Sequence, residues 1–473
     1  MVFNSLSFAV FLPIVLIGYY LLPFRGQNRF LLLASLIFYA WWDWRFLALL
    51  GLTIVVDYYA SHAIHRASTQ KLKLRWLRLS LLSNLTVLGI FKYSNFFVTS
   101  FISALTRIGF QVHPVTIQLA LPIGISFYTF MSMAYVIDVY WGKFEPVRNF
   151  FDFALFVSYF PHLVAGPILR AHQLLPQLTR ERHVTKEQIR DGLALMLVGY
   201  MRKVLIADIL AGVVDEAFHN IPGMTSADLV IRLWLCAIQI YGDFAGYSDI
   251  ARGVSKLFGI ELHLNFATPL LSQNITEFWR RWHISLSSWL RDYVYIPLGG
   301  NRKGAGRTYL NNLLTMLVSG LWHGANWTFI AFGAVHGISL TVHKAWLALT
   351  GKTMPKGYGT NPWSLWTPFK IFLTFNLFAF SLVLFRSPSF AIAWEYLVRV
   401  FSFAPGIHLG SSLFVIPFAL LALTFDLLQY TGFGERLIGR MTPVTQSLAF
   451  GTLFALILIA GSDNSLPFVY FQF

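Results

Sequence analysis

The chain has 473 residues, of which 56% are hydrophobic and only 12% carry a charged side chain. Soluble domains carry about 25% charged residues and could not bury this much apolar surface, so the composition excludes a soluble globular protein. The long unbroken apolar runs also exclude an outer-membrane barrel, whose strands alternate in polarity. The sequence therefore predicts an all-α polytopic membrane protein.

The formal net charge of +15 arises from 36 Lys and Arg residues against 21 Asp and Glu residues. In a membrane protein this excess is expected of cytoplasmic loops, which collect Lys and Arg under the positive-inside rule. The basic residues gather in clusters, over residues 25–29, 66–78, 170–190, 280–307 and 436–440. No nucleic-acid-binding motif accompanies them, so we expect no nucleic-acid partner. The single cysteine, Cys236, excludes a disulfide framework and a Cys-based metal site.

The apolar N-terminal run has neither a basic leader nor a small-residue cleavage site, which predicts a retained first span. Because Arg25 and Arg29 follow it, its start is expected outside the cytoplasm. Further spans are predicted over residues 30–41, 46–60, 79–105, 115–141, 192–214, 229–250, 309–322, 327–347, 369–385, 413–430 and 445–460. These runs give roughly ten to twelve transmembrane helices. Alternation with the basic loops places both termini outside, in a single membrane domain over residues 1–473.

Two stretches fit poorly as simple spans. Residues 150–169 contain Pro161, Gly166 and Pro167, and residues 266–300 mix charged with aromatic side chains. Irregular backbone at membrane depth is tolerated where protein surrounds it or where it lines a cavity. Both stretches are therefore predicted to form re-entrant or in-plane helices.

The segment FWRRWHISLSSWLRDYVYIPLGGNRKG, residues 278–304, carries the first candidate catalytic group, His283. Histidines and charged groups are costly inside a bilayer, so they persist there mainly where they serve a pathway or a reaction. On a continuous helix, Trp279, Arg280 and Leu286 would lie within one turn of His283. We therefore expect His283 to share a helix face with an aromatic and a basic side chain.

The same segment and the loop that follows it are rich in cations. The candidates for binding the phosphates of a nucleotide or phosphopantetheine donor are Arg280, Arg281, Arg291, Asn301, Arg302 and Lys303. The alternative is an ordinary positive-inside loop that binds no ligand, and the residues alone do not separate the two.

The segment LVSGLWHGANWTFIAFGAVHG, residues 317–337, carries two further histidines. Gly320 and Gly324 are expected to leave the imidazole of His323 accessible, and a neutral imidazole is the usual general base for hydroxyl attack on a thioester. The alternative is that His323 only bonds a neighbouring carbonyl. His336 is the rival candidate, for which a buried structural histidine is the favoured interpretation.

RRWHISLSSWLRDYVYIPLGGNR followed by SGLWHGANWTFIAFGAVHG resembles the membrane-bound O-acyltransferase superfamily, and within it the alginate O-acetyltransferase branch, which is related to the teichoic-acid D-alanyl transfer protein. The resemblance also covers FKYSNFF, LPIGISFYTFMSMAYVIDVY, FPHLVAGPILR and QIYGDFAGYSDIARGVSKLFGIEL. It implies that His323 is the catalytic histidine and His283 the second polar residue of the active site. It also implies a fold in which helices ring a thinned centre, where a cytoplasmic donor tunnel meets an external funnel.

The chain ends in PFVYFQF, where Phe468, Tyr470 and Phe473 form an F-x-Y-x-x-F pattern. One interpretation is an aromatic anchor at the membrane interface. The pattern also resembles the tail of D-alanylation systems, in which a terminal tyrosine accepts the acyl group transiently. This resemblance implies that Tyr470 is an acyl relay to a periplasmic partner.

Together these features predict an O-acetyltransferase of the bacterial inner membrane. It would move acetyl from a cytoplasmic thioester, acetyl-CoA or an acyl carrier, across the membrane to an exported polysaccharide such as alginate. We expect no bound cofactor or metal; the expected partners are inner-membrane lipids, the polysaccharide and a periplasmic hydrolase-like transferase. The alternatives are a polysaccharide or lipid transporter, which would usually show inverted repeats that we do not find, and a non-catalytic subunit of a glycan export complex.

Overall fold

The computed structural model describes residues 1–110, 119–354, 363–407, 410, 412–461 and 468. Every regular element in this part of the chain is helical. Six helical segments in it are long and apolar enough to cross a membrane: Trp44–Arg66, Gln70–Arg107, Ser226–Lys256, Thr367–Arg386, Ser412–Tyr430 and Pro443–Ala460. Leu6–Leu21 is a shorter apolar helix of the kind that the estimate of ten to twelve spans also included. The predicted class, an all-α polytopic membrane protein, is confirmed.

The chain divides into two compact units. Unit 1 comprises Met1–Ala194 and Ala251–His263, and unit 2 comprises Leu195–Ile250 and Leu264–Phe473. α10 (Lys186–Tyr200) and α12 (Ser226–Lys256) each contribute residues to both units.

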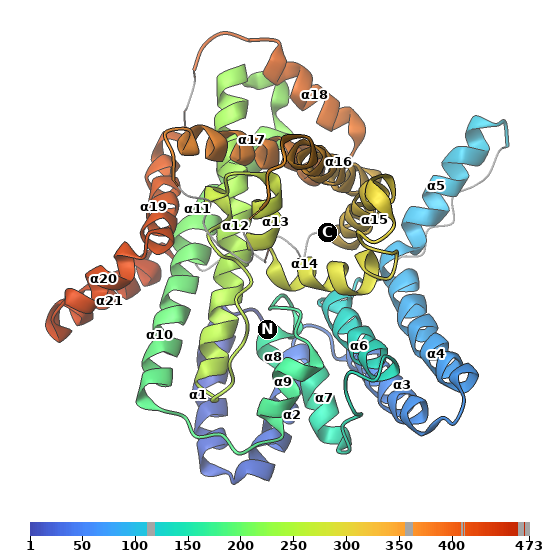
Figure 1. The fold of residues 1–473 in the computed structure, drawn as a ribbon. Coiled ribbons are helices and arrows are strands. Elements are labelled where there is room, and N and C mark those ends of the chain that lie inside the picture. Colours follow the sequence, from blue (N-terminus) through green and yellow to red (C-terminus); the bar gives the residue numbers. More distant parts are fainter. Residues whose placement is uncertain (111–118, 355–362, 408–409, 411, 462–467, 469–473) are drawn as a thin grey trace. The chain divides into compact units, whose positions relative to one another are not determined.

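Unit 1 contains the N-terminal helices. They are α1 (Leu6–Leu21), α2 (Phe24–Ala40), α3 (Leu47–Arg66), α4 (Gln70–Leu88), α5 (Ser94–Arg107), α6 (Ile125–Tyr140), α7 (Phe150–Ser158), α8 (Phe160–Leu163) and α9 (Ala171–Leu178). Pro23 separates α1 from α2, because the residue before a proline is driven out of the helical region, and Leu22 is extended accordingly. α3, α4 and α6 lie side by side (Figure 1).

The stretch over residues 150–169 is not a single span, as predicted. It breaks at Tyr159 between α7 and α8, and residues 153–171 are all buried within the protein. The break frees the backbone N–H of Phe160, which donates to Ser35 Oγ of α2 at 3.1 Å. The backbone N–H at this break thus has a protein hydrogen-bond partner, as irregular backbone at membrane depth must.

Unit 2 contains most of the helices that follow α10. They are η3 (Met201–Asp208), α11 (Ile209–His219), α13 (Ile275–Arg281), α14 (Ile284–Leu290), η6 (Arg291–Tyr295), α15 (Gly304–His323), α16 (Trp327–Thr350), α17 (Thr367–Arg386), α18 (Phe390–Phe401), α19 (Ser412–Tyr430), α20 (Phe433–Arg440) and α21 (Pro443–Ala460), besides most of α12. Buried ion pairs join η3, α12 and α19: Arg202 lies 2.5 Å from Asp249 and 3.1 Å from Asp426. The single guanidinium of Arg202 thus attracts two carboxylates, which offsets part of the cost of burying these charges.

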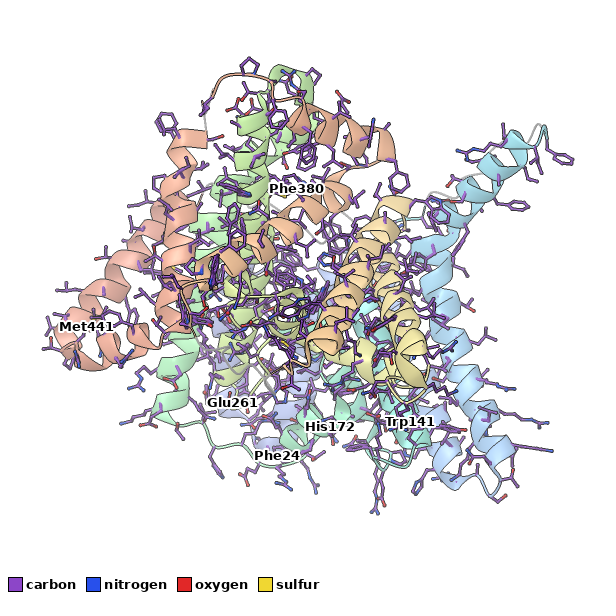
Figure 2. The ribbon with its side chains drawn as sticks, turned by 45° about the horizontal axis from the view of Figure 1, so that its top comes forward. Phe24, Trp141, His172, Glu261, Phe380 and Met441 are labelled. Carbon is purple, nitrogen blue, oxygen red and sulfur yellow. The ribbon has the colours of Figure 1, made fainter. Side chains whose placement is uncertain are left out.

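The helices of unit 2 differ in how much surface they bury. In α12, 83% of the most apolar stretch is buried, whereas in α21 the figure is 6%. Met441 lies at the turn that joins α20 to α21, and Phe380 lies on α17 (Figure 2). The ring of Phe380 stacks on that of Phe401 of α18, with ring centroids 6.1 Å apart. α12 is therefore shielded by protein, while α21 presents most of its surface outward.

Candidate active site

The chain turns sharply at His283, so the prediction of one continuous helix through this residue was wrong. α13 ends at Arg281, α14 begins at Ile284, and His283 has a left-handed backbone with φ 42°. The cause is tertiary: the Ala267 N–H donates to the Arg281 carbonyl, and the Ile284 N–H donates to the Asn265 carbonyl, both at 2.9 Å. His283 therefore does not share a helix face with Trp279 and Arg280.

Polar partners orient the imidazole of His283 from one side. Its Nδ1 lies 3.3 Å from Asn265 Oδ1, which also accepts from the backbone N–H and the hydroxyl of Ser285. Asn265 in turn donates through Nδ2 to Ser248 of α12 at 3.3 Å. Because an amide oxygen only accepts, this contact assigns the proton to Nδ1 and leaves Nε2 as an acceptor.

Aromatic rings enclose the rest of His283, which is fully buried. Its ring centroid lies 4.6 Å from that of Phe244 and 5.7 Å from that of Trp322. The Trp322 ring also contacts His323 at 5.1 Å, so the two histidines predicted to act together do meet at one tryptophan. Burial, and then the neighbouring His323, hold the pKa of His283 well below its usual range, because both disfavour the imidazolium. His283 is a neutral base in this setting.

His323 is the last residue of α15 and is 4% exposed, so the expectation of an accessible imidazole was wrong. The flanking glycines serve packing. A Cβ on Gly320 would lie 2.2 Å from the carbonyl oxygen of Phe329, and one on Gly324 would lie 2.2 Å from the Phe329 ring. They let α15 and α16 approach closely, and His323 is covered by Phe385 at 5.5 Å between ring centroids.

Both ring nitrogens of His336 have hydrogen-bond partners. The indole N–H of Trp279 donates to Nδ1 at 3.3 Å, and Nε2 lies 3.0 Å from Ser381 Oγ. Ser381 donates onward to the Phe378 carbonyl at 2.6 Å. The chain of donors leaves His336 no nitrogen for a substrate, which favours the structural interpretation of this histidine.

A cavity of ≈ 640 Å³ lies between α13, α14, η6, α15 and α16. Three cations line it, Arg280, Arg291 and Lys344, together with Trp279 and several hydroxyl and amide groups. Lys344 Nζ donates to Tyr295 OH at 3.3 Å. Trp279 thus forms a wall of the cavity while its N–H holds His336.

The other candidates for donor binding lie elsewhere. Arg281 is buried, forms an ion pair with Glu277 at 3.0 Å and donates to the Ala267 carbonyl, so it supports the turn before His283. Asn301, Arg302 and Lys303 are exposed on the turn before α15 and do not line the cavity. Within the described residues, no group of three or more His, Cys, Asp or Glu side chains could hold a metal.

The C-terminal tail reaches the same aromatic cluster through Phe468. This residue is 2% exposed, and its ring lies 5.4 Å from Phe244 and 5.3 Å from Tyr247 of α12. Phe468 is therefore buried in protein. Tyr470 and Phe473 lie outside the described residues.

Sequence reasoning did not identify Phe244, Ser248 or Asn265 as neighbours of His283. Phe244 and Ser248 belong to the motif QIYGDFAGYSDI, so their place in that motif was the available signal. No signal in the sequence identified Asn265, because only the tertiary turn brings its amide to Nδ1 of His283.

Comparison with known proteins identifies the family of the chain. Residues 147–389 match the profile described as MBOAT, membrane-bound O-acyltransferase family. The chain is 40% identical to the probable alginate O-acetylase of Pseudomonas putida over 100% of both chains. It is 36% identical to the peptidoglycan O-acetyltransferase of Helicobacter pylori over 84% of this chain and 79% of that one. It is 31% identical to the teichoic acid D-alanyltransferase of Streptococcus thermophilus over 61% of this chain and 75% of that one.

The family profile, the full-length relative and the six apolar helices agree with one another. The chain belongs to the membrane-bound O-acyltransferase family, as a multi-pass O-acetyltransferase of the bacterial inner membrane.

Proposed function

We propose that the protein takes acetyl from a cytoplasmic thioester and delivers it across the membrane for O-acetylation of an exported polysaccharide, such as alginate. The observation that carries this proposal is the meeting of His283 and His323 at Trp322, with Phe468 of the tail packed against Phe244 beside them. The names of the O-acetylating relatives support a glycan as the acceptor. The chain belongs to a family of acyltransferases, which disfavours the alternatives of a transporter and a non-catalytic subunit.

In the proposed reaction His323 is the general base. It takes the proton of an acceptor hydroxyl as the oxygen attacks the thioester carbonyl and forms the new C–O bond. The tetrahedral intermediate then collapses, the C–S bond breaks, and the proton on His323 passes to the departing thiolate. Atoms and charge balance without a metal or a further reactant.

His283 orients the acceptor in this scheme. Its Nδ1 proton is directed to Asn265, so Nε2 presents a lone pair that accepts a hydrogen bond from the attacking hydroxyl. That tautomer supports a role in orienting the nucleophile over one in polarising the donor carbonyl, since polarisation needs an N–H donor. Burial keeps the imidazole neutral and therefore able to accept.

The cavity lined by Arg280, Arg291 and Lys344 is the proposed donor site. Its cations suit phosphate groups, and acetyl-CoA and an acyl carrier both present a phosphate on phosphopantetheine. Trp279 and Met316 give the cavity an apolar wall that suits the pantetheine arm. The site would recognise the phosphate and the pantetheine arm, which the two donors share.

Tyr470 is the proposed relay. Phe468, two residues earlier, is buried on α12 against the ring that contacts His283, which supports a tail that reaches the reaction centre. A phenyl ester is more activated than an alkyl ester, so Tyr470 could pass acetyl onward to a periplasmic hydrolase-like transferase. That partner would then acetylate the polysaccharide.

Acetyl analysis of the polysaccharide in a deletion strain tests the proposal. Complementation with His323→Ala should lower polymer acetylation by about 10² to 10⁴-fold, the usual effect of losing a general base. His219→Ala changes an exposed histidine at the end of α11 and should restore full acetylation. Normal acetylation with His323→Ala, at normal protein abundance, would show that His323 is not the base.

A further inference from the structure

The first turns of α4 carry a cluster of cations without acidic neighbours in the sequence. Residues 58–137 contain no Asp or Glu, and five of the seven Lys and Arg residues in this stretch lie between residues 66 and 78. In the described part of the chain, no ion pair involves the α4 cations Lys71, Arg75 and Arg78. The protein itself therefore supplies no counter-charge for this cluster within bonding distance.

These three cations lie on the face of α4 that points away from the protein. Buried residues of α4, such as Ser80 and Asn84, belong to the face that packs on α3 and α6. The cations follow one another at spacings of four and three residues, which places them together on the opposite side of the helix. All three are exposed: Lys71, Arg75 and Arg78.

Two leucines continue this face toward the apolar part of the helix. Leu82 and Leu85 follow Arg78 at the same spacings of four and three residues, and they are 65% and 51% exposed. They lie about 6 and 10 Å beyond Arg78 along the helix axis. In the candidate span Gln70–Arg107, only 17% of the most apolar stretch is buried, so most of its surface is left for lipid. The face thus changes from cationic to apolar along its length, as a phospholipid changes from headgroup to acyl chain.

Trp76 places the cations at the level of the lipid headgroups. Tryptophan concentrates at membrane interfaces, and Trp76 is 40% exposed on the turn that carries Arg75 and Arg78. The apolar run begins at Leu79, whereas α4 begins at Gln70, about two and a half turns earlier. The first turns of α4 therefore extend beyond the hydrocarbon core and present their charges among the headgroups.

We propose that this face of α4 binds an anionic phospholipid, with the lipid phosphate at Arg75 and Arg78 and an acyl chain along Leu82 and Leu85. The planar guanidinium groups of arginine match the oxygens of a phosphate. Lys71 adds a charge further along the headgroup layer. The positive-inside rule predicts that this lipid belongs to the cytoplasmic leaflet. Inorganic phosphate would match only the cations, whereas a phospholipid matches the cations and the leucines.

Native mass spectrometry of the purified protein in detergent, titrated with dioleoyl phosphatidylglycerol or dioleoyl phosphatidylcholine, measures the two affinities. We expect tighter binding of phosphatidylglycerol, because each cation near a membrane surface raises the affinity for an anionic lipid by about fivefold. Arg75→Gln combined with Arg78→Gln should weaken phosphatidylglycerol binding by about 25-fold and leave phosphatidylcholine binding unchanged. The matched control combines Arg180→Gln with Arg190→Gln, which removes two exposed cations elsewhere in unit 1 and should keep the wild-type affinity.

A second pair of substitutions tests the acyl-chain contact. Leu82→Ala combined with Leu85→Ala should weaken the binding of both lipids alike, since it removes apolar surface and no charge. All four substituted α4 positions are exposed, so Tm in lipid-free detergent should stay at its wild-type value. Inorganic phosphate should not displace phosphatidylglycerol.

Three results would overturn the proposal. They are equal affinities of the wild-type protein for the two lipids, an equal loss of phosphatidylglycerol binding in the control variant, and displacement of the lipid by inorganic phosphate, which would assign the cations to a soluble anion. None of these measurements depends on acetyl transfer, so they stand apart from the proposed function.

Discussion

His283 joins a candidate catalytic side chain to a backbone conformation that few residues adopt. Its φ of 42° lies in the left-handed region, which costs most L-residues about 1–2 kcal/mol and which Asn tolerates better than most. The turn also directs the backbone groups on either side of it to residues 265 and 267. The proposed role of His283 in the reaction and its role in the local fold therefore depend on the same position, and substitutions have to separate the two.

His283→Asn should remove the imidazole while keeping the turn. We expect acetylation to fall by at least about tenfold, because the attacking hydroxyl loses its orientation, with little change in Tm. His283→Ala should lower both, since alanine is strained at this φ. Polymer acetyl content and thermal unfolding in detergent measure the two effects. Wild-type acetylation in His283→Asn would exclude this residue from the reaction.

Tyr470→Phe distinguishes a relay from an anchor, because it removes only the hydroxyl. If Tyr470 carries acetyl, polymer acetylation should fall about as far as with His323→Ala, at normal protein abundance. An anchor would tolerate the change, since phenylalanine also suits an apolar environment. The matched control is Tyr20→Phe, which removes a hydroxyl that bonds the Leu257 carbonyl in unit 1. Full acetylation in Tyr470→Phe would rule out the relay.

At the scale of elements, the hairpin of α15 and α16 sets the position of His323. Gly320 and Gly333 lie at the contact: a Cβ on either would come within 2.2 Å of a backbone carbonyl oxygen of the facing helix. Backbone cannot move aside as a flexible side chain can. The separation of the two helices, and with it the place of His323 one turn after Gly320, is therefore fixed by residues that lack a side chain.

Gly320→Ala should force the hairpin apart. Overpacking of this kind costs about 1–3 kcal/mol, so Tm should fall, and acetylation should fall with it as His323 is displaced. Gly306→Ala changes the exposed start of the same helix, where nothing lies within 4 Å of the added Cβ, and should leave Tm unchanged or slightly raised. Equal Tm values for the two variants would contradict the packing role of Gly320.

The elements that sequence predicted best are long, continuous apolar runs. The apolar runs over residues 413–430 and 445–460 became α19 and α21 with nearly the predicted bounds. The helix predicted over residues 79–105 instead begins at Gln70. Its first turns carry polar side chains, so a prediction based on apolar runs placed the start of the helix too late. The break at His283 could not be predicted, since its cause is a pair of backbone bonds from a separate segment. The motif made His323 a candidate, but its burial depends on Phe385, far along the chain.

At the scale of the whole molecule, the orientation predicted from the basic loops is testable with single cysteines. In a Cys236→Ser background, Lys303→Cys should resist a membrane-impermeant thiol reagent in intact spheroplasts, because the positive-inside rule predicts that its basic loop is cytoplasmic. Asn220→Cys, in the segment before α12, should be labelled. Both positions are exposed, so both should react once the membrane is broken. Labelling of Lys303→Cys but not of Asn220→Cys in intact cells would reverse the orientation.

The enclosure of α12 has a consequence for how the enzyme responds to its lipids. Its 31 residues extend about 46 Å, well beyond a hydrocarbon core of about 30 Å. Hydrophobic mismatch acts on surfaces that lipid touches, and α12 is mostly covered by protein, whereas α21 is not. A thinner or thicker bilayer should therefore tilt the outer helices first. Phe244 and Ser248, which α12 holds beside the His283 site, would keep their places when acyl-chain length changes with growth temperature.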